Sequence, residues 1–320
     1  MHRRKTQFAT RVNRVALSLE RRGVAATYEA HDRLLANRTA RRHHARATRP
    51  VLDEMQQEIV DRLRADGYAL LSFSDLFPDP ETWAPCEESA SAFIAGCEQG
   101  VARERATGEV ASELSRRPGK EFVLRRYPYG SALDIHDPWL HLAAGRRMLD
   151  IANAYHGFWS KLEYVDLWYT PPVPESTQRQ VSQNWHFDYN DRHLLKAFIY
   201  LVDVDEETGP FEFIPGTEPG GKLESVWPWR PAGRGYPPPE TFDEEAKQLP
   251  VKTFVGPKQT MLFCNTAGLH RGGFATGKAR VLATFTYDSP AALKSLTQRN
   301  YRFVTDNGPP ADPVVRYALT

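Results

Sequence analysis

The chain has 320 residues, of which 41% are hydrophobic and 25% are charged, and its formal net charge is +1. A net charge near zero argues against a protein that binds nucleic acid or membrane surfaces over its whole extent. The sequence contains no apolar run of about 18 residues, so we expect no transmembrane helix. Three cysteines, Cys86, Cys97 and Cys264, stand in no zinc or redox spacing, so we expect reduced thiols in a cytoplasmic protein.

The first fifty residues differ in charge from the rest. They contain thirteen Lys or Arg and three Asp or Glu, which gives +10 and leaves −9 for the remainder. Apolar residues at helical spacing predict an amphipathic helix ending near Gly23 and a second helix over 24–36, followed by a polar linker over 38–50. We interpret residues 1–50 as a basic helical extension, dispensable for catalysis, that packs on the body or joins subunits of a homo-oligomer. Docking on nucleic acid or on an anionic membrane is the alternative.

Residues 51–320 predict one mainly β domain with flanking helices. Helical patterns cover about 52–63, 89–106 and 138–155. Apolar and alternating segments predict strands at 68–73, 122–126, 164–169, 194–204, 211–214, 260–264 and 280–287. Many short strands after flanking helices favour a double-stranded β-helix, or jelly roll. The Pro-, Gly- and Trp-rich segment 219–250 is too long for a hairpin and predicts a lid or binding loop.

One group of polar residues predicts a metal site. His186 and Asp188 alternate on an extended segment, so their side chains share a face, and His270 follows a later strand. Two imidazoles and a carboxylate can occupy one face of an octahedral Fe(II) and leave three positions open. A lone His-x-Asp pair is weak evidence, since chance supplies about one in a chain of this composition. Polar side chains on a buried barrel face are costly, however, unless something binds them.

Arg280 predicts the binding of a keto acid. It opens the apolar strand RVLATFTY, where an inward-pointing Arg needs a carboxylate partner. The planar guanidinium can hold the C5 carboxylate of 2-oxoglutarate in bidentate fashion. Lys278, in the predicted loop GFATGK, is the competing cation, and we rank it lower.

The motifs WHFD, LLKAFIYLVDVDEETGPFEFIPGT, NTAGLHRGG and KAR, in this order, resemble the phytanoyl-CoA dioxygenase family of iron(II)/2-oxoglutarate enzymes over about residues 51–290. Thr217-Glu218 stands where that family has Ser-His. The resemblance implies that His186, Asp188 and His270 bind Fe(II), that O2 takes the last metal position, and that Arg280 binds 2-oxoglutarate. Further candidates for contact with the cosubstrate are Thr284 and Tyr169. Halogenases of the superfamily carry a small residue in place of the carboxylate, so Asp188 implies hydroxylation or a related oxidation.

The substrate is less well indicated. Residues that follow the metal pair, or that lie in the long insertion, are candidate substrate contacts: Tyr189, Asn190, Arg192, Trp227 and Trp229. Loop packing explains each of them equally well. Their polar and aromatic character favours a polar, ring-bearing small molecule over a long acyl chain. The alternatives are a hydroxylase of protein or nucleic acid, suggested by the basic extension, and a non-catalytic jelly-roll binding protein.

Overall fold

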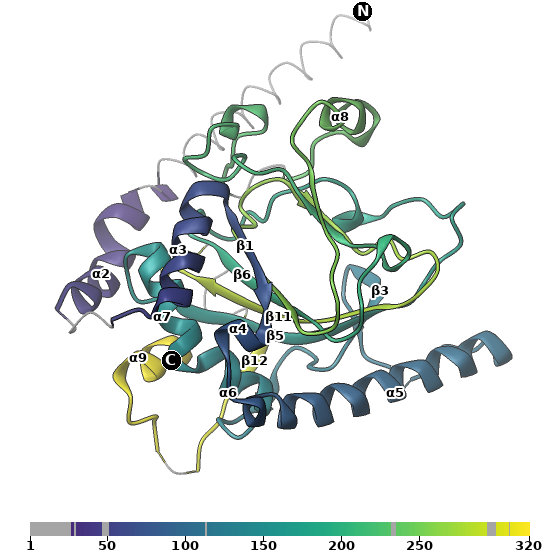
Figure 1. Ribbon diagram of the computed structural model, residues 1–320, viewed down its shortest axis with the longest axis horizontal. Helices are drawn as coiled ribbons and strands as arrows, with labels where there is room; N and C mark the ends of the chain where they lie inside the picture. The colour runs from purple at the N-terminus through teal and green to yellow at the C-terminus, as the bar shows by residue number, and fades with distance from the viewer. Residues whose placement is uncertain are drawn as a thin grey trace, which may run out of the picture.

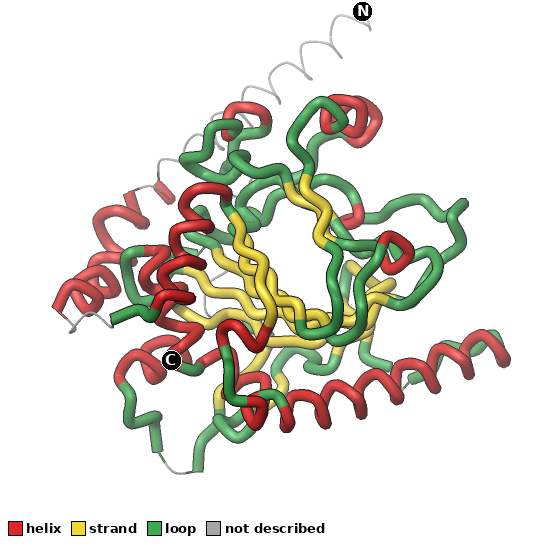
Figure 2. Tube along the Cα trace, viewed as in Figure 1, coloured by secondary structure: helices red, strands yellow, loops and turns green. Residues whose placement is uncertain are grey.

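The computed structural model describes residues 27–28, 30–46, 51–112, 114–231, 235–292, 299–306 and 308–320. Its centre is a seven-stranded antiparallel sheet in the order β1-β9-β6-β11-β5-β3-β2 (Figures 1 and 2). The strands of this large sheet are β1 (Tyr68–Ser72), β2 (Arg116–Arg117), β3 (Lys120–Arg125), β5 (Lys161–Thr170), β6 (Leu195–Tyr200), β9 (Thr260–Cys264) and β11 (Arg280–Asp288).

A second, smaller antiparallel sheet has the order β10-β7-β8. Its strands are β7 (Phe211–Phe213), β8 (Lys252–Phe254) and β10 (His270–Arg271), and a separate parallel pair joins β4 (Ser131–Leu133) to β12 (Tyr301–Phe303). Phe211, Phe213 and Phe254 of the small sheet pack against Phe198 and Leu282 of the large one. The two sheets therefore enclose an apolar interior, and the predicted jelly roll is confirmed.

The two faces of the large sheet carry different side chains, as the alternation of a strand requires. Along β11, Val281, Ala283, Phe285 and Tyr287 enter the core that includes the helices, whereas Leu282 faces the small sheet. The helices are η1 (His31–Ala36), α2 (Asn37–Arg46), α3 (Glu54–Asp66), α4 (Phe73–Leu76), α5 (Ala84–Thr107), α6 (Pro138–Ala144), α7 (Arg146–His156), α8 (Pro239–Ala246) and α9 (Pro313–Leu319). Among the described residues, no helix is long and apolar enough to cross a membrane.

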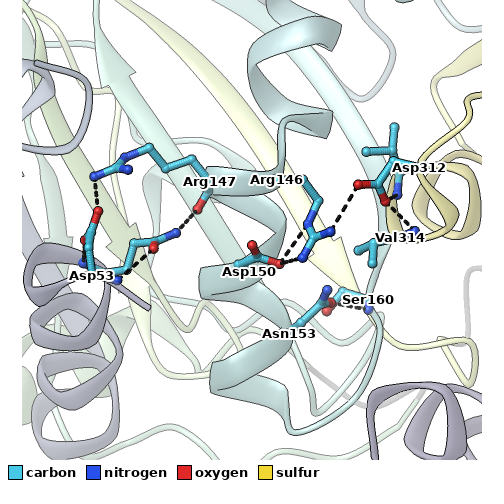
Figure 3. A network of polar contacts seen from close by, with 10 residues as sticks. Asp53, Arg146, Arg147, Asp150, Asn153, Ser160, Asp312 and Val314 are labelled. Carbon is cyan, nitrogen blue, oxygen red and sulfur yellow. Dashed lines mark hydrogen bonds and ion pairs between the residues drawn. The ribbon is translucent and has the colours of Figure 1, made fainter. Parts of the chain in front are cut away.

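Helix α7 is tied to its neighbours by ion pairs (Figure 3). Arg147 reaches Asp53, the residue that caps α3, while Arg146 pairs with Asp150 at 2.9 Å and with Asp312 at 3.0 Å. Asp312 also accepts the Val314 N–H at the start of α9. These contacts fix the positions of α3, α7 and α9 relative to one another.

Several predicted boundaries change. The linker predicted over 38–50 is wrong, because α2 runs to Arg46 and buries Ala40, while its His43 ring stacks on Trp159 at 4.9 Å between centroids. Tertiary contacts hold this polar sequence in a helix. The helix predicted over 138–155 is interrupted at Gly145, and the insertion contains the unpredicted α8. The helix predicted to end near Gly23 lies outside the described residues.

Candidate metal centre

The site is built first by main-chain pairing. His186 and His270 form an isolated antiparallel bridge and exchange two hydrogen bonds, of 2.9 and 2.8 Å. The Asp188 N–H donates to the Thr266 carbonyl at 2.8 Å, which continues this pairing. Two distant parts of the chain are thereby fixed side by side, and the rings of His186 and His270 lie 4.2 Å apart between centroids.

The three predicted ligands meet at one point. One ligand atom from each of His186, Asp188 and His270 can be chosen so that all three lie within 4.8 Å of one another. Ligands at bonds of about 2.1 Å would lie about 3 Å apart, so a bound ion needs only a small contraction. This cluster is the structural counterpart of the His-x-Asp and His motifs.

Both imidazoles are oriented for metal binding. The Nδ1 atom of His186 lies 3.0 Å from the Asn184 carbonyl oxygen, and that of His270 lies 2.9 Å from the Gly268 carbonyl oxygen. A carbonyl only accepts, so each Nδ1 carries the proton and each Nε2 keeps a lone pair. Such a hydrogen bond to the outer nitrogen is the usual support of a metal-bound histidine.

The electrostatics favour the protonation states that a metal requires. Burial lowers the pKa of His270 to about 4 and that of His186 well below its usual value, so both rings are neutral near pH 7. Burial opposes ionisation of Asp188, but Lys196 and the two histidines outweigh it and hold the pKa of that carboxyl well below its usual range. Lys196 Nζ lies 2.5 Å from Asp188 Oδ2.

Arg280 shares a small cavity with the three ligands. The guanidinium is buried, and one terminal nitrogen donates to the Gly209 carbonyl at 3.1 Å. Its Nε has no hydrogen-bond partner, and no carboxylate of the described residues pairs with it. Burial lowers the pKa of Arg280 to about 10, which still leaves it charged at neutral pH. A buried cation without an anion is costly, so this site calls for an anionic ligand.

Two glycines make room for this guanidinium. A Cβ on Gly272 would lie 3.0 Å from Arg280 Nη1, and one on Gly273, where φ is +80°, would lie 2.5 Å from Nη2. Lys278, by contrast, is exposed and pairs with Asp205 at 2.7 Å. The structure thus separates the two candidate cations: Arg280 faces the cavity and Lys278 faces solvent.

The rest of the cavity was not predicted. It is lined, besides the ligands and Arg280, chiefly by Lys120, Trp168, Lys196, Phe198, Phe211 and Leu282. Lys196 could have been found, because it interrupts the apolar run LLKAFIYL and a buried strand carries a lysine only at a cost. Lys120 and Trp168 give no such signal, since their positions depend on how β3 and β5 pair.

The other predicted cosubstrate contacts, Thr284 and Tyr169, are not among the residues that line this cavity. Thr284 is fully buried, shares a face of β11 with Arg280, and its hydroxyl has no hydrogen-bond partner. It does not line the cavity. Tyr169 belongs to the core on the helical side of the large sheet, whereas its neighbour Trp168 lines the cavity. We therefore do not include Tyr169 in the proposed site.

None of the five predicted substrate contacts lines the cavity in the described part of the chain. Trp229 Nε1 donates to the Asp188 carbonyl at 2.9 Å, and Trp227 packs at the edge of a separate apolar cluster. Arg192 lines another, polar cavity of about 440 Å³. Tyr189 is partly exposed, and Asn190 is half-buried.

The insertion, residues 219–250, contacts the segment that carries His186 and Asp188. The Gly235 carbonyl accepts the Phe187 N–H at 2.9 Å, and the Tyr236 ring stacks on His186 at 5.0 Å between centroids, nearly parallel. Trp229 contacts the Tyr28 ring at 5.3 Å. The N-terminal extension thus reaches the shell of residues behind Asp188.

No family model and no curated protein matches the sequence. Solved structures with a similar chain course include the epimerase SnoN in complex with Fe3+, alpha-ketoglutarate and nogalamycin RO, at 18% identity and a TM-score of 0.47, covering 81% of this chain and 93% of that one. EctD from S. alaskensis with 2-oxoglutarate and 5-hydroxyectoine aligns at 17% identity and 0.49, covering 80% and 85%. These likenesses are weak, so the functional argument rests on the residues themselves.

Proposed function

We propose that this protein is an iron(II)- and 2-oxoglutarate-dependent oxygenase that oxidises a C–H bond of a polar small molecule. The observation that carries the proposal is a single cavity that holds two neutral imidazoles, a carboxylate and a buried guanidinium without an anion. Two histidines and one carboxylate with open positions are the ligand set of non-haem iron oxygenases.

The donor set fits Fe(II), and the orphan guanidinium fits the far carboxylate of a keto acid. When bound, iron and 2-oxoglutarate would supply an O2-dependent oxidation that releases succinate and CO2. His186, Asp188 and His270 would hold the iron, and Arg280 would hold the cosubstrate and set its direction along the cavity. Resemblance to the phytanoyl-CoA dioxygenase family is consistent with this assignment but remains a prediction.

The remaining residues of the site have physical tasks. Phe198, Phe211 and Leu282 give the cavity apolar walls, which limit the access of water and strengthen every charge interaction inside. Lys196 fixes one oxygen of Asp188 and so restricts the orientation of the carboxylate. The cavity measures about 50 Å³, less than a five-carbon diacid needs, so we expect flexible side chains such as Lys196 to move aside when the cosubstrate binds.

The experiment is a measurement of 2-oxoglutarate decarboxylation by purified protein with Fe(II), ascorbate and O2, read as CO2 and succinate. Even without the substrate, we expect slow turnover that depends on both Fe(II) and 2-oxoglutarate. His270→Ala should abolish it, whereas His136→Ala, which alters an exposed histidine, should not. Turnover that survives His270→Ala, or no binding of 2-oxoglutarate to the iron-loaded protein, would refute the proposal.

A further inference from the structure

We propose that the substrate oxidised at this site is a small carboxylate, and that Arg117 binds its carboxylate group beside the metal cavity. This inference rests on the proposed function and names the substrate class. It concerns residues that the sequence analysis did not select, on the hairpin formed by β2 and β3.

Arg117 carries a guanidinium that has aromatic neighbours but no counter-ion among the described residues. Its carbon Cζ lies 4.5 Å from the centre of the Trp168 ring and 5.4 Å from that of Tyr164, so the cation lies over two aromatic rings. Its Nη1 is buried and forms no hydrogen bond, and no carboxylate of the described residues pairs with the side chain. Buried donors in native proteins are nearly always satisfied, so an unsatisfied one needs an explanation.

The position of Arg117 connects it to the site. Trp168, on which it lies, lines the metal cavity, and so does Lys120, its cross-strand partner in the hairpin. The charge of Arg117 also acts on the Tyr236 hydroxyl, whose ring covers His186. A substrate that binds in the cavity against Trp168 could therefore reach Arg117 with a terminal carboxylate.

A neighbouring arginine, Arg125, lies over the same Tyr164 ring, at 6.0 Å from its centre, and differs from Arg117 in having an internal counter-ion. Arg125 of β3 forms a fully buried ion pair with Asp166 at 3.0 Å, and Asp166 is held further by the Tyr127 N–H and the Tyr164 hydroxyl. The chain supplies an internal carboxylate for Arg125 and none for Arg117. The difference points to an external carboxylate at Arg117.

The charges of the cavity favour the same ligand. Three cations, Lys120, Lys196 and Arg280, line it, and Asp188 is the one carboxylate among the described residues that line it, so cationic side chains are in excess along its wall. Fe(II) and the 2-oxoglutarate dianion would cancel each other and would not reduce this excess. A substrate anion would reduce it, whereas a cationic substrate would be repelled.

The test uses protein loaded with Zn(II) in place of Fe(II) and with 2-oxoglutarate, so that no turnover occurs. The probes are a set of aromatic and aliphatic carboxylic acids, each matched with its primary amide, and binding is measured by saturation-transfer NMR followed by titration. The variants are Arg117→Met and, as a matched control, Arg116→Met. Arg116 is the adjacent residue, but it points to α5, where it pairs with Glu104 at 2.6 Å.

We expect acids to bind and their amides to bind weakly or not at all. Arg117→Met should weaken acid binding about ten- to hundredfold, as expected for the loss of a charge-assisted hydrogen bond, and Arg116→Met should leave it unchanged. The affinity for 2-oxoglutarate should be the same in all three proteins. Acids and amides that bind alike, or no binding of either, would overturn the inference.

Two further outcomes separate this inference from the proposed function. If Arg117→Met weakens 2-oxoglutarate as strongly as it weakens the acids, the residue serves the cosubstrate and the inference is wrong. If Zn(II) and 2-oxoglutarate fail to bind before any probe is added, the proposed function is wrong, and this is seen independently of Arg117.

Discussion

The Tyr28 hydroxyl donates a 2.5 Å hydrogen bond to Asp191, and this contact joins the N-terminal extension to the loop that leaves the metal site. Asp191 is fully buried and also accepts the Ser289 and His193 N–H groups, at 2.7 and 3.0 Å. The same Tyr28 ring packs against Trp229, whose indole N–H donates a hydrogen bond to the Asp188 carbonyl. The extension is therefore connected to the metal loop by buried polar contacts.

We expect Tyr28→Phe to destabilise the protein by about 1–3 kcal/mol, because a buried carboxylate loses a donor that no water replaces. Denaturant unfolding measures this change. Tyr129→Phe is the control, since that ring is exposed and its hydroxyl forms no hydrogen bond in the structure. An unchanged unfolding free energy for Tyr28→Phe would show that this contact does not anchor the extension to the body.

Arg280→Leu should weaken 2-oxoglutarate binding by roughly 30- to several-thousand-fold, which corresponds to the loss of about 2–5 kcal/mol from a buried, charge-assisted pair. Isothermal titration of the anaerobic, iron-loaded protein measures it. Lys278→Leu should have no effect, because Lys278 is exposed and already paired with Asp205. A large loss in the lysine variant with none in the arginine variant would mean that the cosubstrate site has been misplaced.

Gly273→Ala should also weaken 2-oxoglutarate binding, although it removes no charge. The added methyl group would lie 2.5 Å from Arg280 Nη2 and displace the guanidinium. Gly220→Ala controls for backbone strain, since Gly220 has a similar φ of +87° but nothing within 4 Å of the added Cβ. We expect a loss of at least tenfold in 2-oxoglutarate affinity in the first variant and none in the second. Equal affinities would show that the position of Arg280 is unimportant.

The buried Lys161 should make the stability of the protein depend on pH. It is buried, donates to the Tyr317 carbonyl at 2.8 Å, and its burial lowers its pKa from 10.5 to about 8. Between these two values the unfolded chain binds a proton that the folded protein has released, so this group makes stability rise with pH in that window, at about 1.4 kcal/mol per pH unit.

We therefore expect the unfolding free energy of the wild type, relative to Lys161→Met, to increase by about 2 kcal/mol from pH 7.5 to 9.5. Urea unfolding at the two pH values measures this difference. Lys247→Met, which alters an exposed lysine just after α8, should show no such trend. A constant difference between the wild type and Lys161→Met would mean that Lys161 keeps its ordinary pKa.

The sequence predicted the metal cluster because its signal is local. His186 and Asp188 share a face through strand alternation, and His270 and Arg280 adjoin apolar strands that only a β core can bury. The residues of β3 and β5 that line the cavity could not be predicted in this way. Lys120 and Trp168 reach the cavity through the pairing of β3 and β5, which depends on sheet topology rather than on any local pattern.

The errors in the predicted elements have the same origin. Residues of α2 are polar and rich in Arg, so no apolar stripe indicated a helix; contacts such as that between His43 and Trp159 stabilise it. Trp227 and Trp229 stay predictions as substrate contacts: in the structure Trp227 packs against an apolar cluster, and Trp229 donates a hydrogen bond to a main-chain carbonyl. Aromatic residues in a long loop serve packing as readily as binding, and only the fold decides between them.

The most direct test of the central claim is anaerobic binding of Fe(II) and 2-oxoglutarate, followed by the visible charge-transfer absorption that appears when a keto acid chelates ferrous iron. We expect the wild type to give this absorption with one equivalent of each, and His270→Ala to give none while its thermal unfolding remains cooperative. Absence of the band in the wild type, or its persistence at full intensity in His270→Ala, would contradict an iron centre formed by His186, Asp188 and His270.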